Sequence, residues 1–458
     1  MITPQRREVV AGLAAVAGLG ACATNLRRSS TSKPNVVLII ADDLRADAIA
    51  KRDKLGIKTP HIDALVAEGH SFDDAFVTTS ICPTSRASIM TGQFASNHKY
   101  WNWSEITQAQ LDRGLYGLMK SAGYQTAYIG KWGLGTESRE NFFNIWYGFD
   151  NFKLYYDEEY GGKHLTEFIG AKAVNAINQL KDAPFFLTFA TLAPHTQHRE
   201  PYWDADHVYD ESYKELFYPT APSATTEAFD RLPEFLKTSE GRERWRQRFG
   251  NPETASETLR DYYRLVNGLD AQVGRIVSAL KERNLYDDTL IVFTSDNGML
   301  LGEHGLSGKW WMFEESIRVP LVIKMPSGSR REPIPQVALN IDVMPTILEA
   351  CSLQIPQTVD GKSLLASGPQ RTQFFYEHLF DHPRIIKSEG IWSPSYKYIN
   401  YGVGGSTYEM LFDLRIDPYE LNNLALLPGS QVILSEYRER FKSEKARVQR
   451  AHTDEAAE

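Results

Sequence analysis

The sequence predicts an α/β protein with a large, mainly parallel sheet sandwiched by helices, followed by a smaller C-terminal antiparallel sheet with a helix. Three observations support this prediction: short apolar runs rich in β-branched residues, helical patterns between those runs, and a change of texture near residue 370. The chain has 458 residues, of which 42% are hydrophobic. This composition excludes a disordered chain and a multispanning membrane protein, and the length allows a large domain with a smaller partner.

The expected strands are uninterrupted apolar runs, which are typical of strands buried on both faces of a parallel sheet. The first is NVVLIIA at Asn35–Ala41, and similar runs occupy residues 125–130, 184–192, Thr289–Ser295 and 320–325. The clearest helical pattern between the runs forms one apolar stripe, made of Leu265, Leu269, Val273, Ile276 and Leu280. Strands that alternate with helices predict a doubly wound sheet, whose ligands bind beyond the carboxyl ends of the strands.

We divide the chain into an export signal and tether (residues 1–33), a main α/β domain (34–368) and a small C-terminal α+β subdomain (369–458). In the subdomain, alternating aromatic runs at 373–376 and 396–401 predict antiparallel strands, and Gln431–Arg450 predicts a charged closing helix. Residues 199–257 are polar and weakly periodic, which indicates an insertion over one end of the sheet.

The first 22 residues have the pattern of an export signal. Arg6 and Arg7 precede an apolar run at 9–19 that is too short to span a bilayer, and the pair fits a twin-arginine signal. Leu19-Gly20-Ala21-Cys22 resembles a bacterial lipobox, so Cys22 is expected to carry a lipid anchor, unless a plain cleavable signal ends there. We therefore expect an exported, periplasmic or outer-membrane-attached lipoprotein.

Charge and cysteine content narrow the function further. The formal charge of −8 offers no basic footprint for nucleic acid, so an anionic substrate must be held by local cations. The chain has three cysteines, too few for a disulfide scaffold. Cys351 follows an apolar helical pattern and reads as a core residue, which leaves Cys82 to be explained.

Polar side chains follow four of the predicted strands: Asp42-Asp43, Lys131, His195 and Asp296-Asn297. Adjacent carboxylates at the end of a buried strand raise each other's pKa unless a cation compensates them. Three carboxylates and one amide oxygen suit Ca²⁺, with Mg²⁺ as the second choice. Taken alone, each pair is more often part of a turn or a helix cap than a metal site.

The segment Ile81–Gly92, ICPTSRASIMTG, is the most informative. It resembles the signature of the type I sulfatases of the alkaline-phosphatase superfamily, Cys-x-Pro-Ser-Arg followed by a helix and Thr-Gly. Cys82, Ser85, Arg86 and Thr91-Gly92 match it, whereas Thr84 stands where the family has proline. We expect the helix to begin near Ser85, so that Cys82 lies at its N-terminus, where backbone N–H groups favour negative charge.

Further segments match landmarks of the same family in order, from about residue 34 to residue 425. The segments are Asp42-Asp43, Gly130-Lys131-Trp132, Ala193-Pro194-His195, Asp296-Asn297, Gly302 to Lys309, Arg318 to Leu321, and Phe412 to Pro418. The sequence departs from the family again at Gly133, which replaces a histidine that follows the first lysine segment. His98, His198 or His304 are candidates to take over that role.

The resemblance implies a bacterial carbohydrate sulfatase that releases inorganic sulfate. It implies that a formylglycine-generating enzyme oxidises Cys82, that a calcium ion binds Asp42, Asp43, Cys82, Asp296 and Asn297, and that catalysis uses Cys82, Arg86, Lys131, His195 and Lys309. The chemistry is consistent: cations neutralise the sulfate oxygens, a hydrated aldehyde supplies one hydroxyl to attack sulfur and another to release the product, and His195 or Lys309 protonates the leaving alcohol.

Two other functions remain open at this point. One is a phosphatase or phosphonate monoester hydrolase of the same superfamily, with Thr84 or unmodified Cys82 as nucleophile. The other is an inactive carbohydrate-binding lipoprotein. Four tryptophans (Trp101, Trp103, Trp310 and Trp311) read either as core residues or as platforms that stack on sugars.

Overall fold

The structure is a computed structural model and describes residues 33–49, 54–136, 139–150, 153–180, 184–327, 329 and 336–450. The predicted export signal and the lipid attachment site at Cys22 lie outside these residues. Among the described helices, none combines the length and the apolar character that a bilayer span requires.

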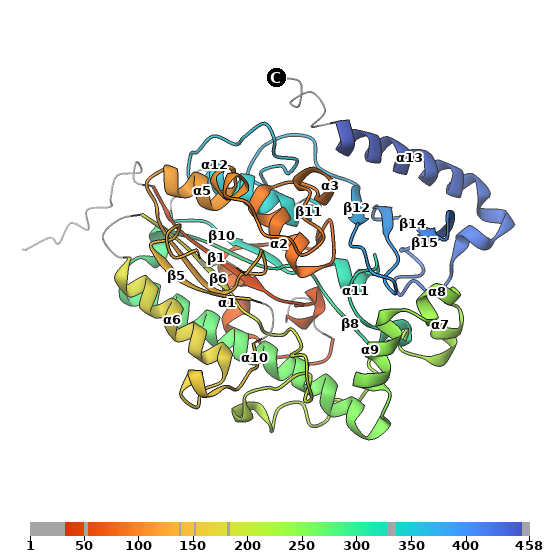
Figure 1. The fold of residues 1–458 in the computed structure, drawn as a ribbon, viewed down its shortest axis with the longest axis horizontal. Helices are drawn as coiled ribbons and strands as arrows, with labels where there is room; N and C mark the ends of the chain where they lie inside the picture. Colours follow the sequence, from red (N-terminus) through yellow and green to blue (C-terminus); the bar gives the residue numbers. More distant parts are fainter. Residues whose placement is uncertain are drawn as a thin grey trace, which may run out of the picture. The chain divides into compact units, whose positions relative to one another are not determined.

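Within the described residues, seven strands form the main sheet (Figure 1). Their order is β2 (His70–Ser71), β10 (Leu321–Lys324), β7 (Thr289–Ser295), β1 (Asn35–Ala41), β6 (Phe185–Ala190), β4 (Gln125–Lys131) and β5 (Ile145–Phe149). The pairs from β7 to β5 are parallel, and β10 and β2 are added antiparallel at one edge. The mainly parallel sheet expected from the apolar runs is therefore confirmed.

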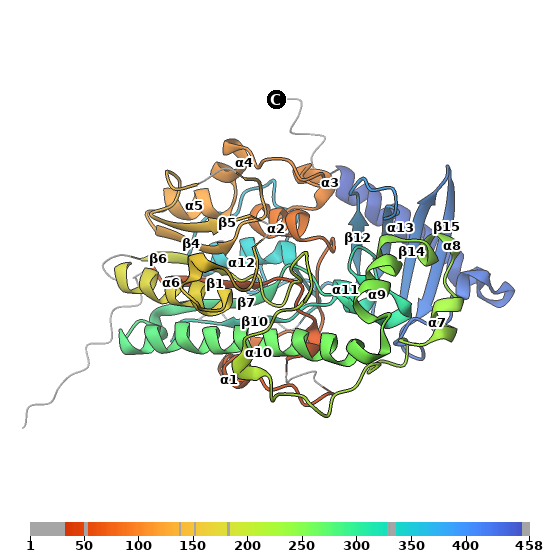
Figure 2. The same cartoon turned by 60° about the horizontal axis from the view of Figure 1, so that its bottom comes forward.

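Helices cover both faces of this sheet (Figure 2). One face packs against α1 (Pro60–Glu68), α6 (Leu165–Gln179) and α10 (Pro252–Glu282), and the other packs against α2 (Cys82–Thr91), α5 (Leu115–Ser121) and α12 (Val343–Ala350). Because side chains of a strand alternate between faces, Val37 and Ile39 enter the first core and Val36 and Leu38 the second.

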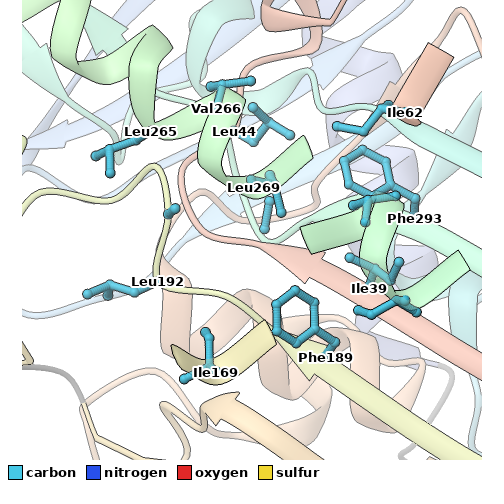
Figure 3. Packing of buried hydrophobic residues seen from close by; sticks show 14 of the residues in the cluster. Ile39, Leu44, Ile62, Ile169, Phe189, Leu192, Leu265, Val266, Leu269 and Phe293 are labelled. Atoms are coloured by element: carbon cyan, nitrogen blue, oxygen red, sulfur yellow. The ribbon is translucent and has the colours of Figure 1, made fainter. Parts of the chain in front are cut away.

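Helix α10 shows how the pattern determines the packing. Every residue of its predicted apolar stripe is buried. Leu265 and Leu269 of this helix belong to the same core cluster as Ile39 of β1 and Phe293 of β7, and Figure 3 shows Leu269 beside Phe293. The N-terminus is capped by Asn251, whose side chain accepts a hydrogen bond from the Glu253 N–H.

The C-terminal part contains an antiparallel sheet of β12 (Phe374–His378), β13 (Ser388–Trp392), β14 (Tyr396–Val403) and β15 (Ser406–Asp413), with α13 (Gln431–Arg450) packed on it. The predicted small sheet and its closing helix are thus confirmed. The weakly periodic insertion contains α7 (Thr226–Asp230), α8 (Glu234–Lys237), α9 (Glu240–Phe249) and the first residues of α10.

The remaining described elements are short. They are α3 (Ala95–His98), α4 (Gln108–Arg113), α11 (Glu314–Ile317), the pair β3 (Ala75–Phe76) and β11 (Ala338–Leu339), and the pair β8 (Leu300–Leu301) and β9 (Ser307–Gly308).

Candidate active site

Helix α2 places Cys82 at the carboxyl edge of the sheet. The helix begins at Cys82 itself, earlier than the predicted start near Ser85, because Pro83 fits the first turn, where its missing N–H costs nothing. Gly92 ends the helix in the left-handed conformation, with φ of 67°, and donates its N–H to the Ser88 carbonyl. The Ser85 hydroxyl accepts a hydrogen bond from Asn340 Nδ2 at 2.9 Å, which ties the helix to the segment before α12.

Asp42 is the centre of one half of the site. Lys131 Nζ lies 2.5 Å from Asp42 Oδ2, and Arg86 Nη2 lies 3.4 Å from the same oxygen. Arg86 also donates from Nε to Asp296 at 2.8 Å and from Nη1 to the Lys131 carbonyl at 2.7 Å. Two cations from different elements, α2 and β4, are therefore held around one buried carboxylate.

Asp43 is the centre of the other half. Lys309 Nζ and Asn297 Nδ2 both donate to Asp43 Oδ1, the latter at 2.5 Å. His195 Nε2 lies 3.7 Å from Asp43 Oδ2. The sulfur of Cys82 lies between the halves, 3.1 Å from Asp42 Oδ1 and 2.7 Å from Lys309 Nζ. The structure thus brings all the predicted site residues into one cluster.

Two oxygen atoms of this cluster are buried without a hydrogen-bond partner. They are Asp43 Oδ2 and Asn297 Oδ1. Ligand atoms from Asp42, Asp43, Cys82 and Asp296 lie within 4.8 Å of one another. Carboxylate and amide oxygens with unsatisfied lone pairs are suitable ligands for a hard divalent cation. The residues present therefore fit the predicted Ca²⁺.

The charges in the cluster balance one another. Burial opposes ionisation of Asp42, but Lys131 and the neighbouring cations hold the pKa of this carboxyl well below its usual range. Burial and the charge of Asp42 raise the pKa of Asp296 to about 6. The carboxyl groups of Asp42, Asp43 and Asp296 thus face the three cations Arg86, Lys131 and Lys309.

The two proposed proton donors differ in charge. Burial, followed by the charge of Lys131, lowers the pKa of His195 to about 3, so its ring is neutral at pH 7. Its Nδ1 lies 2.5 Å from the Thr196 carbonyl, which identifies Nδ1 as the protonated nitrogen. Burial disfavours the ammonium of Lys309, but Asp43 outweighs it and raises the pKa of Lys309 above its usual value.

Burial and the carboxylates of Asp296 and Asp42 raise the pKa of the Cys82 thiol well above its ordinary value. The unmodified sulfur is therefore a neutral thiol, which is a weaker nucleophile than a thiolate. Cys82 is the first residue of α2, and its Sγ contacts the carboxylates and Lys309.

The candidate substitutes for the histidine missing at Gly133 have other environments. His98 Nε2 lies 3.0 Å from Ser88 Oγ, and its Nδ1 accepts the Tyr100 N–H. His304 stacks on Phe313 with ring centroids 4.3 Å apart. His198 is exposed. None of these contacts is with the carboxylates of the site.

The four tryptophans divide between core and surface. Trp310 and Trp311 are buried in the core shared with the C-terminal sheet, whereas Trp103 is 48% exposed and lies edge-on to Phe380. Trp101 is intermediate. Of these four tryptophans, Trp101 and Trp103 are the ones that offer aromatic surface.

Two positioning residues were not predicted. Ser295 Oγ accepts the Leu44 N–H at 2.9 Å and donates to the Asn297 carbonyl at 2.8 Å, so it joins the two loops that carry the carboxylates. Asn340 accepts the Thr78 N–H and donates to Ser85. Ser295 could have been found from its place before Asp296 at a strand end, whereas nothing in the sequence around Asn340 signals its role.

A family model described as Sulfatase matches residues 34–353, and one described as N-sulphoglucosamine sulphohydrolase, C-terminal, matches residues 302–447. Among curated relatives, N-acetylglucosamine-6-O-sulfatase of Bacteroides thetaiotaomicron is 26% identical, over 90% of this chain and 86% of the relative.

Solved structures show the same fold. One, described as a complex with its substrate D-glucosamine-2-N,6-O-disulfate, has a TM-score of 0.75 and 22% identity, and covers 93% of this chain and 100% of that one. A phosphonate monoester hydrolase from Silicibacter pomeroyi has a TM-score of 0.74 and 22% identity, and covers 91% of this chain and 96% of that one. Because the Sulfatase model matches more than half of its length, the chain belongs to the sulfatase family of the alkaline-phosphatase superfamily, which are sulfuric ester hydrolases.

Proposed function

We propose that the protein hydrolyses a sulfate ester of a carbohydrate at the cluster around Cys82, with Ca²⁺ bound and Cys82 converted to formylglycine. The observation that carries the proposal is the balanced charge of the cluster together with its two unsatisfied oxygens. Three carboxylates offset three cations, so a divalent cation would give the site a charge of about +2, which favours an anionic ester.

The cation and the modified residue would supply the electrophilic and nucleophilic parts of the chemistry. A Ca²⁺ ion held by Asp42, Asp43, Asp296 and Asn297 would polarise a sulfate oxygen. A hydrated formylglycine at position 82 would supply the attacking hydroxyl. Both are supported by the donor set and by the family, and neither is part of the structure.

The chain's own residues then have distinct tasks. Arg86 and Lys131, around Asp42, would hold the sulfate oxygens with N–H groups that their present contacts leave available. Lys309 carries a proton next to the attacking position and would protonate the leaving alcohol, whereas the neutral His195 would orient it. We assign Lys309 the acid role because it is the protonated one of the two groups and its Nζ lies 2.7 Å from Cys82 Sγ.

The relatives favour a sulfated sugar as substrate. The curated N-acetylglucosamine-6-O-sulfatase aligns along nearly the whole chain, and a second relative, from Formosa agariphila, is described as an ulvan-active sulfatase. We further propose that the chain is exported and lipidated at Cys22, as the motifs in residues 1–22 predict. Labelled palmitate in wild type but not in Cys22→Ala would support the anchor, and an unlabelled mature protein would refute it.

The decisive experiment is sulfate release from a panel of sulfated sugars by protein made together with a formylglycine-generating enzyme. We expect wild type to release sulfate, Cys82→Ala to lose this activity while keeping its melting temperature, and Thr84→Val to retain activity. A calcium chelator should remove activity, and added Ca²⁺ should restore it more fully than Mg²⁺.

Other outcomes would refute the proposal. An intact Cys82 thiol, with no sulfate released from any substrate, would leave a carbohydrate-binding protein. Faster hydrolysis of phenyl phosphonate than of every sulfate ester would favour the phosphonate hydrolase. Loss of activity in Thr84→Val but not in Cys82→Ala would identify Thr84 as the nucleophile.

A further inference from the structure

Arg248 is a buried cation near the site for which the described residues provide no ion pair. It lies in the last turn of α9, in the insertion, and is 6% exposed. Its partners are hydroxyls: Nη1 donates to Ser307 Oγ at 3.2 Å and Nη2 to Thr196 Oγ1 at 3.3 Å. Burial, followed by the charge of Arg244, lowers its pKa to about 9, so it remains charged at pH 7. A buried charge that lacks a counter-ion is unfavourable, and an anion would offset this cost.

The two hydroxyls place Arg248 on one side of the active site. Thr196 follows His195, and Ser307 precedes Lys309 by two residues. Both segments belong to the half of the site around Asp43, and Asp43 is among the charges that act on Arg248. Since Lys309 is the proposed donor to the leaving alcohol, Arg248 lies on the side where the sugar leaves, away from Arg86 and Lys131 around Asp42.

The guanidinium has hydrogen-bonding capacity to spare. It has five N–H bonds, of which the structure assigns two to hydroxyls, and its Nε is buried without a partner. The rings of Trp203 and Tyr202 lie 5.3 Å and 5.6 Å from it, so aromatic faces support the cation but cannot neutralise it. A planar fork with free donors matches the paired oxygens of a carboxylate or a sulfate.

We propose that Arg248 binds a second anionic substituent of the substrate, a carboxylate or another sulfate, on the sugar that carries the hydrolysed ester. The inference rests on the proposed function and specifies its substrate class as doubly anionic sugars. Arg248 would be a specificity-determining residue that contacts substrate, separate from the groups that hold the transferred sulfate.

The test compares matched substrates in wild type and Arg248→Gln. The reference substrate is the sugar with a single sulfate that wild type hydrolyses best. Its matched partners carry either one additional sulfate or one carboxylate. We expect wild type to prefer a doubly anionic partner and Arg248→Gln to reduce that preference by about 10- to 100-fold in kcat/KM, mainly through KM. The partner whose advantage disappears identifies the anion as sulfate or carboxylate.

Two further variants separate binding from structure. Arg248→Lys keeps the charge without the fork, and we expect it to retain part of the preference. Arg246→Gln removes an exposed arginine of the same helix, which pairs with Glu243, and should leave the preference unchanged. An equal loss on all partners in Arg248→Gln, or the absence of any preference in wild type, would overturn the inference.

Failure of the proposed function would be recognised separately. If wild type hydrolyses nothing in the panel, D-glucosamine-2-N,6-O-disulfate and N-acetylglucosamine 6-sulfate are titrated into the protein by calorimetry. Tighter binding of the disulfate in wild type, lost in Arg248→Gln, would support the role of Arg248 without catalysis. Equal binding of the two sugars would overturn it.

Discussion

Two buried clusters of opposite charges in the described part of the chain differ in how their carboxylates are arranged. In the active-site cluster, ligand atoms of Asp42, Asp43, Cys82 and Asp296 converge within 4.8 Å of one another. In the cluster around Lys397, which lies between the C-terminal sheet and α11, Lys397 Nζ is 2.8 Å from both Glu314 and Glu420.

In the Lys397 cluster the protein itself supplies a cation beside each carboxylate. Both oxygens of Glu314 have partners, since Trp392 Nε1 donates to one at 2.9 Å and Arg318 Nε to the other at 2.8 Å. Glu420 accepts the Glu314 N–H at 2.8 Å. Burial and charge therefore do not distinguish a functional site from a structural one, and neither do atoms without a hydrogen-bond partner, because Lys397 Nζ and Glu420 Oε1 also lack one. The convergence of several potential metal ligands does distinguish the active site.

The largest effect should come from a substitution in the active-site cluster. Asp43→Asn should reduce sulfate release on the order of 10³-fold, because it removes a proposed cation ligand and the partner of Lys309. Its melting temperature should fall, because Lys309 loses the buried carboxylate that pairs with it. Steady-state kinetics and thermal unfolding measure both effects, with the exposed Asp112→Asn as control. Retained turnover would show that Asp43 is not in the reacting centre.

Substitution in the Lys397 cluster should lower stability and leave activity unchanged. Lys397→Met leaves two buried glutamates without their cation and should lower the free energy of unfolding by about 3–5 kcal/mol. Activity per folded molecule should not change. Urea unfolding measures the loss, and Lys442→Met, which removes an exposed pair with Glu439, should cost about 0–1 kcal/mol. Equal losses in the two variants would contradict the comparison.

A single buried carboxylate that accepts backbone hydrogen bonds should give a smaller loss of stability when it is replaced. Asp270 of α10 accepts the N–H groups of His61 and Ile62 at the start of α1, at 3.1 and 2.8 Å. Asp270→Ala leaves both donors unpaired and should cost about 2 kcal/mol of unfolding free energy. Asp270→Asn keeps an acceptor oxygen and should cost less. If the two variants are equally destabilised, the charge matters and the hydrogen bonds do not.

The smallest effect concerns a buried carboxyl that has no cation partner among the described residues. Burial raises the pKa of Glu377, on β12, to about 7, and its side chain accepts the Ser96 N–H at 2.7 Å. Between the ordinary value of 4.5 and about 7, the native state binds more protons than the unfolded state, so stability falls as pH rises through this window.

Glu377→Gln should remove this loss. We expect the variant to match wild type near pH 5 and to exceed it by about 1–2 kcal/mol near pH 8. Chemical unfolding at the two pH values measures the difference, with the exposed Glu439→Gln as control. A variant that tracks wild type at both values would show that Glu377 is not protonated in the native state.

The parts of the fold that are buried on both sides were predictable from sequence. Asn35–Ala41 and Thr289–Ser295 have the predicted bounds because every residue of both strands is buried. The edge strand β5 (Ile145–Phe149) was not predicted, since its residues are only half buried and Gly148 interrupts the apolar pattern. Helix α9 is rich in arginine and lacks an apolar stripe, so Arg248 gave no signal.

The site itself was predictable to the extent that its residues follow strands. Parallel strands bring their carboxyl ends together, and this rule alone gathers Asp42, Lys131, His195 and Asp296. Distances across the site depend on loops and on α2, which have no comparable rule. The residues that join the loops, Ser295 and Asn340, act through hydrogen bonds between segments far apart in the chain.

All ten residues of α2 are buried, and Cys82 is 2% exposed. An enzyme that modifies the Cys82 side chain would have to bind this segment as an extended peptide. In the folded chain the segment is a buried helix and is not accessible in that form. The proposed modification of Cys82 would therefore compete with folding, and the fraction of active molecules would be set once, before each chain has folded. Slowing the closure of the sheet over α2 should increase that proportion, whereas later exposure of the finished protein to the same catalyst should not.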